Sequence, residues 1–266
     1  MYRRIRARME HNLARIASDN KQPGSQSNSD FIVGFNNNHC CESVTRTIVK
    51  SATIPNVFYN INDSGYNLLD TGNNAFTYKI AGSPTTVTVS VGQYTITELL
   101  DALVTALAAV GFSYVVDAKT KRIAFTVTTA IQFLDSDENN MARTLGILTS
   151  SVGDVTTYTT TGFYNLAGVQ EVYLVSSKIS DGSNLILQEG VSEPVIAIIP
   201  MTVPFGEYEH FRAYSEELEQ IDYPSYTQGC SVRQADLIIK NKFNNVLSLG
   251  GLDISVILKL YHNTNS

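Results

Sequence analysis

Several kinds of residue are scarce in this chain, and each scarcity narrows what the protein can be. Tryptophan is absent, and of the three cysteines Cys40 and Cys41 are adjacent while Cys230 stands apart. Such an arrangement does not build a disulfide framework, so a reducing compartment is the default expectation. No apolar run approaches the roughly 20 residues of a membrane span. The amino terminus also lacks the hydrophobic segment of a secretory signal.

Charge is scarce as well. Only 17% of the residues are charged, which is low for a soluble enzyme, whereas 43% are hydrophobic. The polar surface must therefore come from Asn, Ser and Thr, a composition typical of β-sandwiches with Asn-rich turns. A chain of 266 residues can form one large all-β domain, or one domain with an insertion.

The few charges are unevenly distributed along the chain. Residues 1–21 carry six basic side chains and two acidic ones, Glu10 and Asp19, which gives a net charge of +4. Because the whole chain has a net charge of −6, residues 22–266 carry a net charge of −10. The six basic residues are Arg3, Arg4, Arg6, Arg8, Arg15 and Lys21. A basic arm on an acidic body indicates a segment that contacts another molecule.

The apolar residues of this arm have helical spacing, which predicts an amphipathic helix over residues 2–16 and a polar linker over 20–30. The helical stripe consists of Tyr2, Ile5, Met9, Leu13 and Ile16. We expect the tethered helix to dock on a neighbouring subunit. Contact with nucleic-acid phosphates or with a membrane interface remains open, and an Arg-rich, acid-poor start also fits a mitochondrial presequence.

Beyond Phe31 the chain alternates short strand patterns with turn residues. Strands are expected at 31–35, 44–50, 53–61, 75–80, 169–176, 184–188, 194–203, 205–214, 232–240 and 252–262. We predict a mainly β fold, an antiparallel single jelly-roll β-sandwich over 31–262 with an inserted β-α-β-β unit at about 87–147. An arm and linker over 1–30 precede this domain, and a tail over 263–266 follows it. The segment 207–222 is ambiguous, because its apolar residues also have helical spacing.

One helix is strongly specified within the predicted insertion. Thr95 and Glu98 form a capping box, an apolar face runs from Ile96 to Val110, and Gly111 ends the helix. A hairpin over 112–127 follows, with its turn at residues 117–120. A short helix around 139–146 ends at Gly146.

No motif for catalysis or cofactor binding is found. The sequence has no G-x-S-x-G, H-E-x-x-H, Walker loop, G-x-G-x-x-G before a helix, or C-x-x-C. Its histidines, His11, His39, His210 and His262, are scattered. We therefore expect a protein that is not an enzyme, with no cofactor, no metal and no small-molecule substrate.

Three local clusters have a functional interpretation and a simpler one. The run His39-Cys40-Cys41 offers metal-ligand types, but three consecutive residues do not face one ion easily, which favours a loop with buried thiols. The segment 135–140 begins like a calcium loop but lacks its glycine and final acid, which favours a solvated turn or helix N-cap. An acidic cluster favours a solvated face or a subunit contact over paired catalytic carboxylates. Its members are Glu207, Glu209, Glu216, Glu217, Glu219 and Asp222.

Two segments resemble parts of a known protein family. The first is the run TTVTVSVGQYTITELL from Thr85 to Leu100, which is followed by the hairpin and the turn Leu145-Gly146-Ile147. The second comprises ADLIIK at 235–240 and LSLGGLDISVILKL at 247–260, with EVYLVSS at 171–177 and SNLI at 183–186 upstream. In this order they resemble minor capsid proteins of virophages, polinton-like viruses and related large DNA viruses, over roughly residues 70–262.

The resemblance implies a single jelly-roll penton protein of a virion. Five copies would close a vertex of an icosahedral capsid and contact the surrounding major capsid proteins. The arm would then lie inside the shell, against other minor capsid proteins or the genome. A cyclic ring requires two different surfaces on each copy, which the edges and loops of a jelly roll can supply.

Two other kinds of protein remain as alternatives. The first is a different particle protein, either another minor capsid or cement protein or a receptor- or glycan-binding jelly roll, and in the binding module the insertion at 87–147 would be the recognition domain. Tyr158, Phe163 and Tyr164 in the Thr-rich loop could supply an aromatic platform for a sugar. A cupin-like enzyme would need clustered histidines, which His39, His210 and His262 do not present in the sequence.

Overall fold

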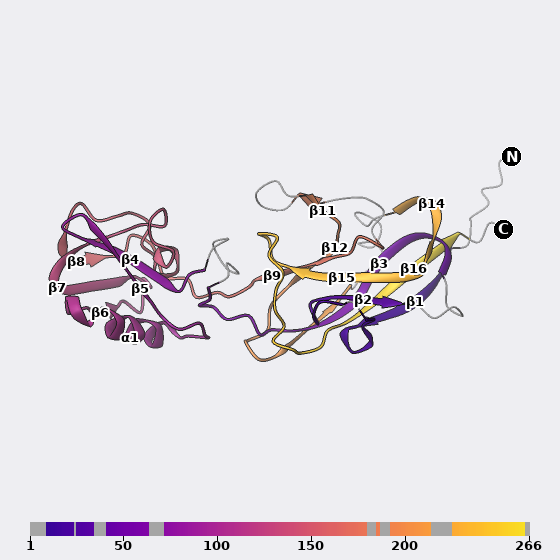
Figure 1. The fold of residues 1–266 in the computed structure, drawn as a ribbon, viewed down its shortest axis with the longest axis horizontal. Coiled ribbons are helices and arrows are strands. Elements are labelled where there is room, and N and C mark those ends of the chain that lie inside the picture. The colour runs from indigo at the N-terminus through magenta and orange to yellow at the C-terminus, as the bar shows by residue number, and fades with distance from the viewer. Residues whose placement is uncertain are drawn as a thin grey trace. The chain divides into compact units, whose positions relative to one another are not determined.

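The computed structural model describes residues 9–23, 25–34, 41–63, 72–179, 185–186, 192–213 and 225–263. The chain divides into two compact units (Figure 1). The sandwich unit comprises residues 1–58 and 170–266, and the insertion unit comprises residues 59–169. The insertion is therefore wider than the predicted 87–147, because β4 and β8 on either side of that range pair with strands inside it.

The first sheet of the sandwich unit, here the β1 sheet, is antiparallel and has the order β1-β16-β3-β13. Strands β13 and β14 pair with the same edge of β3: β13 lies beside the end of β3, and β14 lies beside its beginning. The strands are β1 (Met9–Ala17), β3 (Cys41–Pro55), β13 (Tyr208–Arg212), β14 (Ser225–Val232) and β16 (Ser255–Asn263). The first and last strands thus lie side by side, with β1 paired to β16 along its whole length.

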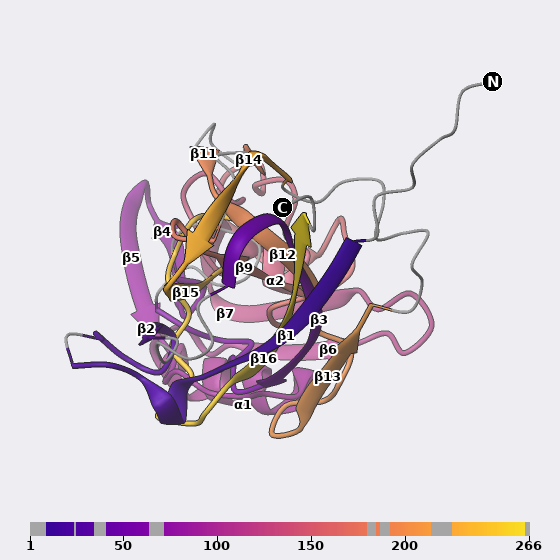
Figure 2. The same cartoon turned by 90° about the vertical axis from the view of Figure 1, so that its right-hand side faces the viewer.

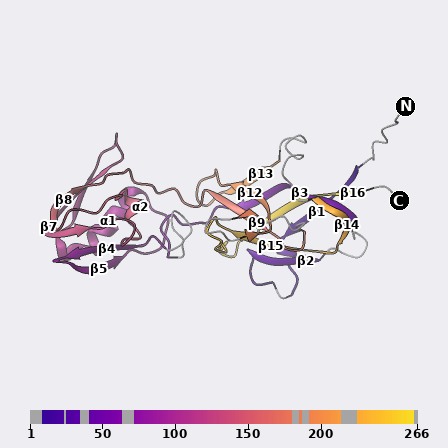
Figure 3. The ribbon, with the colours of Figure 1, turned by 90° about the horizontal axis from the view of Figure 1, so that it is seen from above.

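The second sheet, here the β2 sheet, is also antiparallel and has the order β12-β9-β15-β2. Its strands are β2 (Asp30–Gly34), β9 (Glu171–Val175), β12 (Val195–Pro200) and β15 (Gln234–Lys240). A two-stranded hairpin of β10 (Leu185–Ile186) and β11 (Ser192–Glu193) lies between β9 and β12 in the chain. The strands of both sheets can be followed in Figures 2 and 3.

Alternate residues of both sheets are buried, as expected for a sandwich in which each sheet turns one face inward. In the β1 sheet the last strand buries Ile254, Val256, Leu258 and Leu260, which is the alternation expected from the sequence. In the β2 sheet, β15 buries Ala235, Leu237 and Ile239. Contact between β12 and β3 joins the two sheets.

The insertion unit is a helix packed against an antiparallel sheet of order β5-β4-β7-β6, with β8 also paired to β7. Its strands are β4 (Ala75–Ile80), β5 (Ser83–Thr88), β6 (Ser113–Val116), β7 (Ile123–Phe133) and β8 (Val155–Thr159). Its helices are α1 (Ile96–Ala106), η3 (Ala108–Val110) and α2 (Ala142–Leu145). The first strand of the predicted β-α-β-β unit begins earlier than the expected residue 87, because β5 spans Ser83–Thr88.

The predicted capping box begins α1. The Thr95 hydroxyl accepts a hydrogen bond from the Glu98 N–H at 3.3 Å, and the Glu98 carboxylate accepts one from the Thr95 N–H at 2.8 Å. These two bonds satisfy donors that a helix start leaves without partners. The helix buries Leu99, Leu100 and Leu103, and Gly111 follows with a left-handed backbone at φ 64°.

Aromatic rings build the centre of the insertion core. Phe125 stacks on Phe133 with ring centroids 5.4 Å apart, and Phe133 stacks on Tyr158 at 5.0 Å. Phe112 contacts the other side of Phe125. Because this core is assembled within residues 59–169, the insertion has a hydrophobic core of its own.

Buried asparagines connect the first segment of the insertion unit to its body. The Asn60 carboxamide accepts from the Tyr94 N–H at 2.9 Å and donates to the Tyr94 carbonyl at 2.7 Å. The Asn73 carboxamide donates to the Asn60 carbonyl at 2.9 Å and accepts from the Asn62 N–H at 2.9 Å. These bonds satisfy backbone groups where the chain has no strand partner.

The prediction of an amphipathic helix over 2–16 is wrong for the described residues, because residues 9–17 form strand β1. In a strand, side chains three positions apart point to opposite faces. Ile16 is accordingly buried while Leu13 is 64% exposed. Pairing with β16 supplies each residue of β1 with a strand partner, whereas a helix of this length is marginal in water. Residues 1–8, including Tyr2 and Ile5, lie outside the described residues.

The expected flexible linker over 20–30 is also wrong for the described residues. The Gln22 N–H donates to the Ile32 carbonyl at 2.7 Å, and the Ser25 hydroxyl accepts from the Ile32 N–H at 3.1 Å. The polar side chains that suggested a solvated tether instead bind backbone groups of the body. The predicted strand 44–50 lies within β3, which also takes the first three residues of the predicted strand 53–61 and ends at Pro55.

Candidate assembly surfaces

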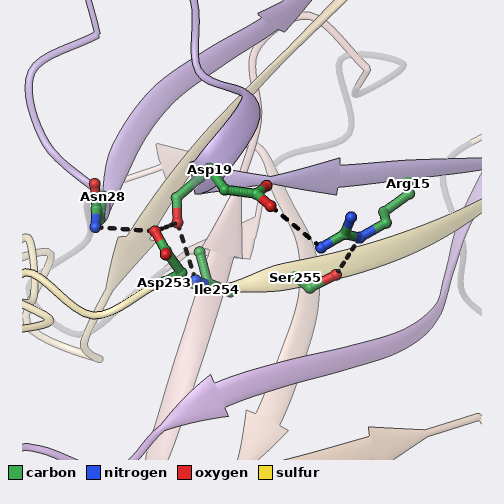
Figure 4. Close-up of polar contacts among 7 residues, drawn as sticks. Arg15, Asp19, Asn28, Asp253, Ile254 and Ser255 are labelled. Atoms are coloured by element: carbon green, nitrogen blue, oxygen red, sulfur yellow. Dashed lines mark hydrogen bonds and ion pairs between the residues drawn. The ribbon is translucent and has the colours of Figure 1, made fainter.

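The segment after β1 is fixed to the start of β16 by a polar cluster (Figure 4). The Ser18 hydroxyl donates to the Asp253 carboxylate at 2.7 Å and accepts from the Ile254 N–H at 3.0 Å. The Asn28 carboxamide donates to the same carboxylate at 3.2 Å and to the Gly251 carbonyl at 2.9 Å. This cluster makes the amino-terminal region part of the folded body.

Two of the six basic residues of the predicted arm lie on this body. The Arg15 guanidinium donates to the Ser255 hydroxyl at 3.1 Å and lies 3.6 Å from the Asp19 carboxylate (Figure 4). Lys21 donates to the Asn28 side chain. The Arg15 side chain remains 57% exposed, so its ion pair is a surface pair of small energetic value. Arg3, Arg4, Arg6 and Arg8 lie outside the described residues, and the Met9 side chain is likewise not described.

The outer face of the β1 sheet is basic. One row of paired residues crosses four strands in the order Arg15, Ile257, Ser51, Arg212. Among the described side chains of these strands Glu209 is the only carboxylate, and it is buried opposite Ile54 on the inner face. The exposed Leu13 lies beside this row and adds an apolar element.

The outer face of the β2 sheet is acidic around an apolar centre. Tyr173 and Val175 are buried there against Val195 and Ile238. Next to them, Ile198 pairs with Tyr173 and is 43% exposed. The carboxylates on this side of the sheet and on the adjoining hairpin are Asp30, Glu171, Glu193 and Asp236. Two basic residues lie among them: Lys240 binds Glu193 at 2.8 Å, and Lys178 donates to the Gln234 side chain at 3.3 Å.

Burial and neighbouring charges shift the titration of this acidic face. The pKa of Asp30 is raised by burial and by the Asp236 carboxylate, against the opposing effect of Lys240. Burial and the hydrogen bond that Tyr173 donates to Glu171 at 2.8 Å raise the pKa of Tyr173 to about 12. Tyr173 therefore stays a neutral donor at physiological pH.

Asp236 fixes the loop that leaves β9. Its carboxylate accepts hydrogen bonds from the hydroxyls of Ser176 (2.6 Å) and Ser177 (2.7 Å) and from the N–H groups of Ser177 (3.0 Å) and Lys178 (2.8 Å). Burial raises the pKa of Asp236, but these hydrogen bonds outweigh it and lower the pKa below its ordinary value.

The three aromatic residues of the predicted recognition loop are separated by their environments. Tyr158 packs on Phe133 and donates its hydroxyl to the Thr149 carbonyl, and Tyr164 is half-buried against the same core. Phe163 is 70% exposed. Of the three, Phe163 alone offers most of its ring to a ligand.

Several of the other candidates from the sequence have structural partners. Asp135 accepts from the Asp137 N–H at 3.2 Å within a turn, and Asn139 is buried and accepts from the Met141 N–H at 3.1 Å. Glu209 accepts from the Thr202 N–H at 2.6 Å; burial raises its pKa, but hydrogen bonds outweigh this and lower it. Residues 35–40 and 214–224, with His39, Cys40 and four acids of the cluster, lie outside the described residues.

Within the part of the chain that the structure describes, no group of three or more His, Cys, Asp or Glu side chains could hold a metal ion. No helix of that part is long and apolar enough to cross a membrane.

Sequence reasoning missed the contrast between the two outer faces. Strand alternation alone predicts that residues such as Arg15 and Arg212 face outward, but it does not predict that they share one row. That row depends on the pairing of β1, β16, β3 and β13, whose positions in the chain are far apart.

Comparison with known proteins gives a match at the level of fold. No family model matches the sequence, and no curated protein matches it either. Among solved structures, the penton protein of mavirus is similar with a TM-score of 0.51 and 10% sequence identity. The match covers 95% of this chain and 99% of the mavirus protein, so it includes both units. The chain therefore has a penton-like, mainly β fold.

Proposed function

We propose that this chain is a structural virion protein, a penton that forms pentameric vertices of an icosahedral capsid and contacts the major capsid proteins. The observation that carries the proposal is the similarity in fold to a penton protein over nearly the full length of both chains. A likeness confined to the sandwich would fit many unrelated proteins, whereas this one also includes the insertion.

The strand order supports a single jelly roll. We leave aside β14 and the hairpin of β10 and β11, and number the other strands of the sandwich unit from one to eight along the chain: β1, β2, β3, β9, β12, β13, β15 and β16. The β1 sheet then has the order one-eight-three-six and the β2 sheet the order two-seven-four-five. This is the arrangement of two interlocked Greek keys in an eight-stranded jelly roll. In this numbering the insertion lies between strands three and four.

We propose a purely structural role for the chain as a component of the virion, without catalysis and without a cofactor. The acids near serines or tyrosines, such as Asp236 and Glu171, are engaged in hydrogen bonds that fix local structure. A glycan-binding function for the loop at 158–164 is not favoured, since Tyr158 packs inward.

Oligomeric state tests the proposal. Light scattering and negative-stain images of the purified chain, alone and with the major capsid protein of the same virus, are expected to show a five-fold ring. A chain that stays monomeric at all concentrations and never joins particles would falsify it.

A further inference from the structure

The two outer faces of the sandwich unit differ in charge, and each combines charge with apolar side chains. The outer face of the β1 sheet carries the exposed cations Arg15 and Arg212 beside Leu13 and Ile257. The outer face of the β2 sheet exposes Ile198 beside carboxylates, among them Asp30 and Glu171, whereas its Tyr173 and Val175 are already buried within the chain. An apolar centre with a charged rim is the usual anatomy of a subunit contact.

We propose that the outer face of the β1 sheet of one copy packs against the outer face of the β2 sheet of the next copy. Arg15 and Arg212 would then meet Asp30 and Glu171 at each subunit boundary. The inference rests on the proposed function, because it names the contact that closes the ring.

A second copy of the chain is the occupant that the charges favour. A cyclic ring needs a heterologous contact, in which two different surfaces of each copy meet. Pairing a face with its own copy would oppose like charges, whereas pairing the basic face with the acidic face matches opposite ones. The two faces therefore favour the head-to-tail contact of a ring over a two-fold dimer.

The composition of the basic face favours a protein partner over nucleic acid. A phosphate-binding surface gathers many Lys and Arg side chains. Here the exposed Arg15 and Arg212 stand at the two ends of a row whose middle is Ile257 and Ser51, and the neighbouring Lys259 is buried with its ammonium over the Tyr261 ring. Arg15 is also free to change partner, since its ion pair with Asp19 is a surface pair at 3.6 Å.

Charge reversal on each face tests the pairing in the full chain. The basic-face variant is Arg15→Glu with Arg212→Glu, and the acidic-face variant is Asp30→Lys with Glu171→Lys. Each is expected to weaken ring formation about 100-fold, because like charges then oppose one another across every boundary. The chain with all four substitutions keeps the wild-type net charge and restores opposite charges, so it is expected to regain the ring. Sedimentation velocity under the conditions in which the wild type assembles gives the readout.

A matched control reverses two cations of the insertion unit, Lys119→Glu with Arg122→Glu, and is expected to leave the ring intact. Circular dichroism establishes that each variant is folded. If the fourfold variant stays monomeric while folded, or the control disrupts the ring equally, the pairing of faces is overturned. Rings that persist in both face variants also overturn it, and binding of a labelled DNA oligonucleotide lost only in the basic-face variant would then identify a nucleic-acid surface. A wild-type chain that forms no ring, either alone or with the major capsid protein, and never joins particles instead refutes the proposed function itself.

Discussion

The insertion unit and the amino-terminal strand differ in how well local sequence patterns predict their structure. In the insertion unit, α1, the following hairpin and the left-handed glycine after α2 all occur where local patterns predict them. The amino-terminal segment was predicted to be a tethered helix, yet residues 9–17 are an edge strand of the sandwich. Arg15 and its hydrogen-bond partner Ser255 are 240 residues apart in the chain. Local signals predict structure well only where the deciding contacts are themselves local.

Removal of β1 tests whether the amino-terminal segment is a strand of the sandwich or a tether. Deleting residues 1–17 would leave the body intact if these residues were a tether. Because they form a paired strand that buries Ile16, we expect the sandwich unit to lose stability by about 3 kcal/mol or more. Denaturant unfolding, with hydrogen exchange to separate the two units, measures the loss. An unchanged midpoint would restore the tether hypothesis.

Phe133→Ala affects the other unit. The Phe133 ring is fully buried between Phe125 and Tyr158, so its truncation leaves a cavity that costs about 3–5 kcal/mol. The loss should appear in hydrogen exchange of residues 59–169 and spare that of β16. Phe163→Ala is the matched control, because the exposed Phe163 ring loses almost nothing on truncation. Equal effects of the two substitutions would contradict the placement of these rings.

Ile16→Ala and Leu13→Ala separate strand from helix in the amino-terminal segment. A helical stripe would make the two side chains equivalent. In the strand only Ile16 is buried, so its truncation should cost about 2–5 kcal/mol, and that of Leu13 should lie within about 0.5 kcal/mol of zero. Thermal unfolding of both single variants measures the difference, and comparable losses would support the helix.

The Asp236 contact gives the smallest effect and a pH dependence. Because its pKa is lower in the folded chain than in the unfolded one, the folded state binds fewer protons, and the stabilisation is present above the unfolded pKa of about 3.9. It is lost as pH falls through the folded pKa. Asp236→Asn should cost about 1–2 kcal/mol at pH 7, a value reduced by partial solvent exposure. The difference between the two chains should shrink below pH 4 in denaturant titrations; a constant difference would show that the carboxylate charge is not involved.

For the candidate surfaces too, the sequence shows which residue types are present but not which residues lie together. Composition alone identifies six basic residues near the amino terminus, but it does not show that Arg15 shares a row with Arg212. The aromatic residues near 158–164 were recognised as a group, but not that Tyr158 belongs to the core. Side-chain type is a property of the sequence, whereas neighbourhood across strands depends on pairing and register, and a shift of one residue moves a side chain to the other face.

Local sequence patterns were enough to predict the β-rich class, the capped helix α1 with its apolar face, the hairpin after it and the alternation of the closing strand. Each of these depends on residues within about one turn or one strand of each other. Three other features depend on tertiary contacts: residues 9–17 form a strand, the insertion extends over 59–169, and opposite charges lie on the two outer faces. These features arise because a strand gains its hydrogen bonds only from a partner, and here the partners lie at distant positions in the chain.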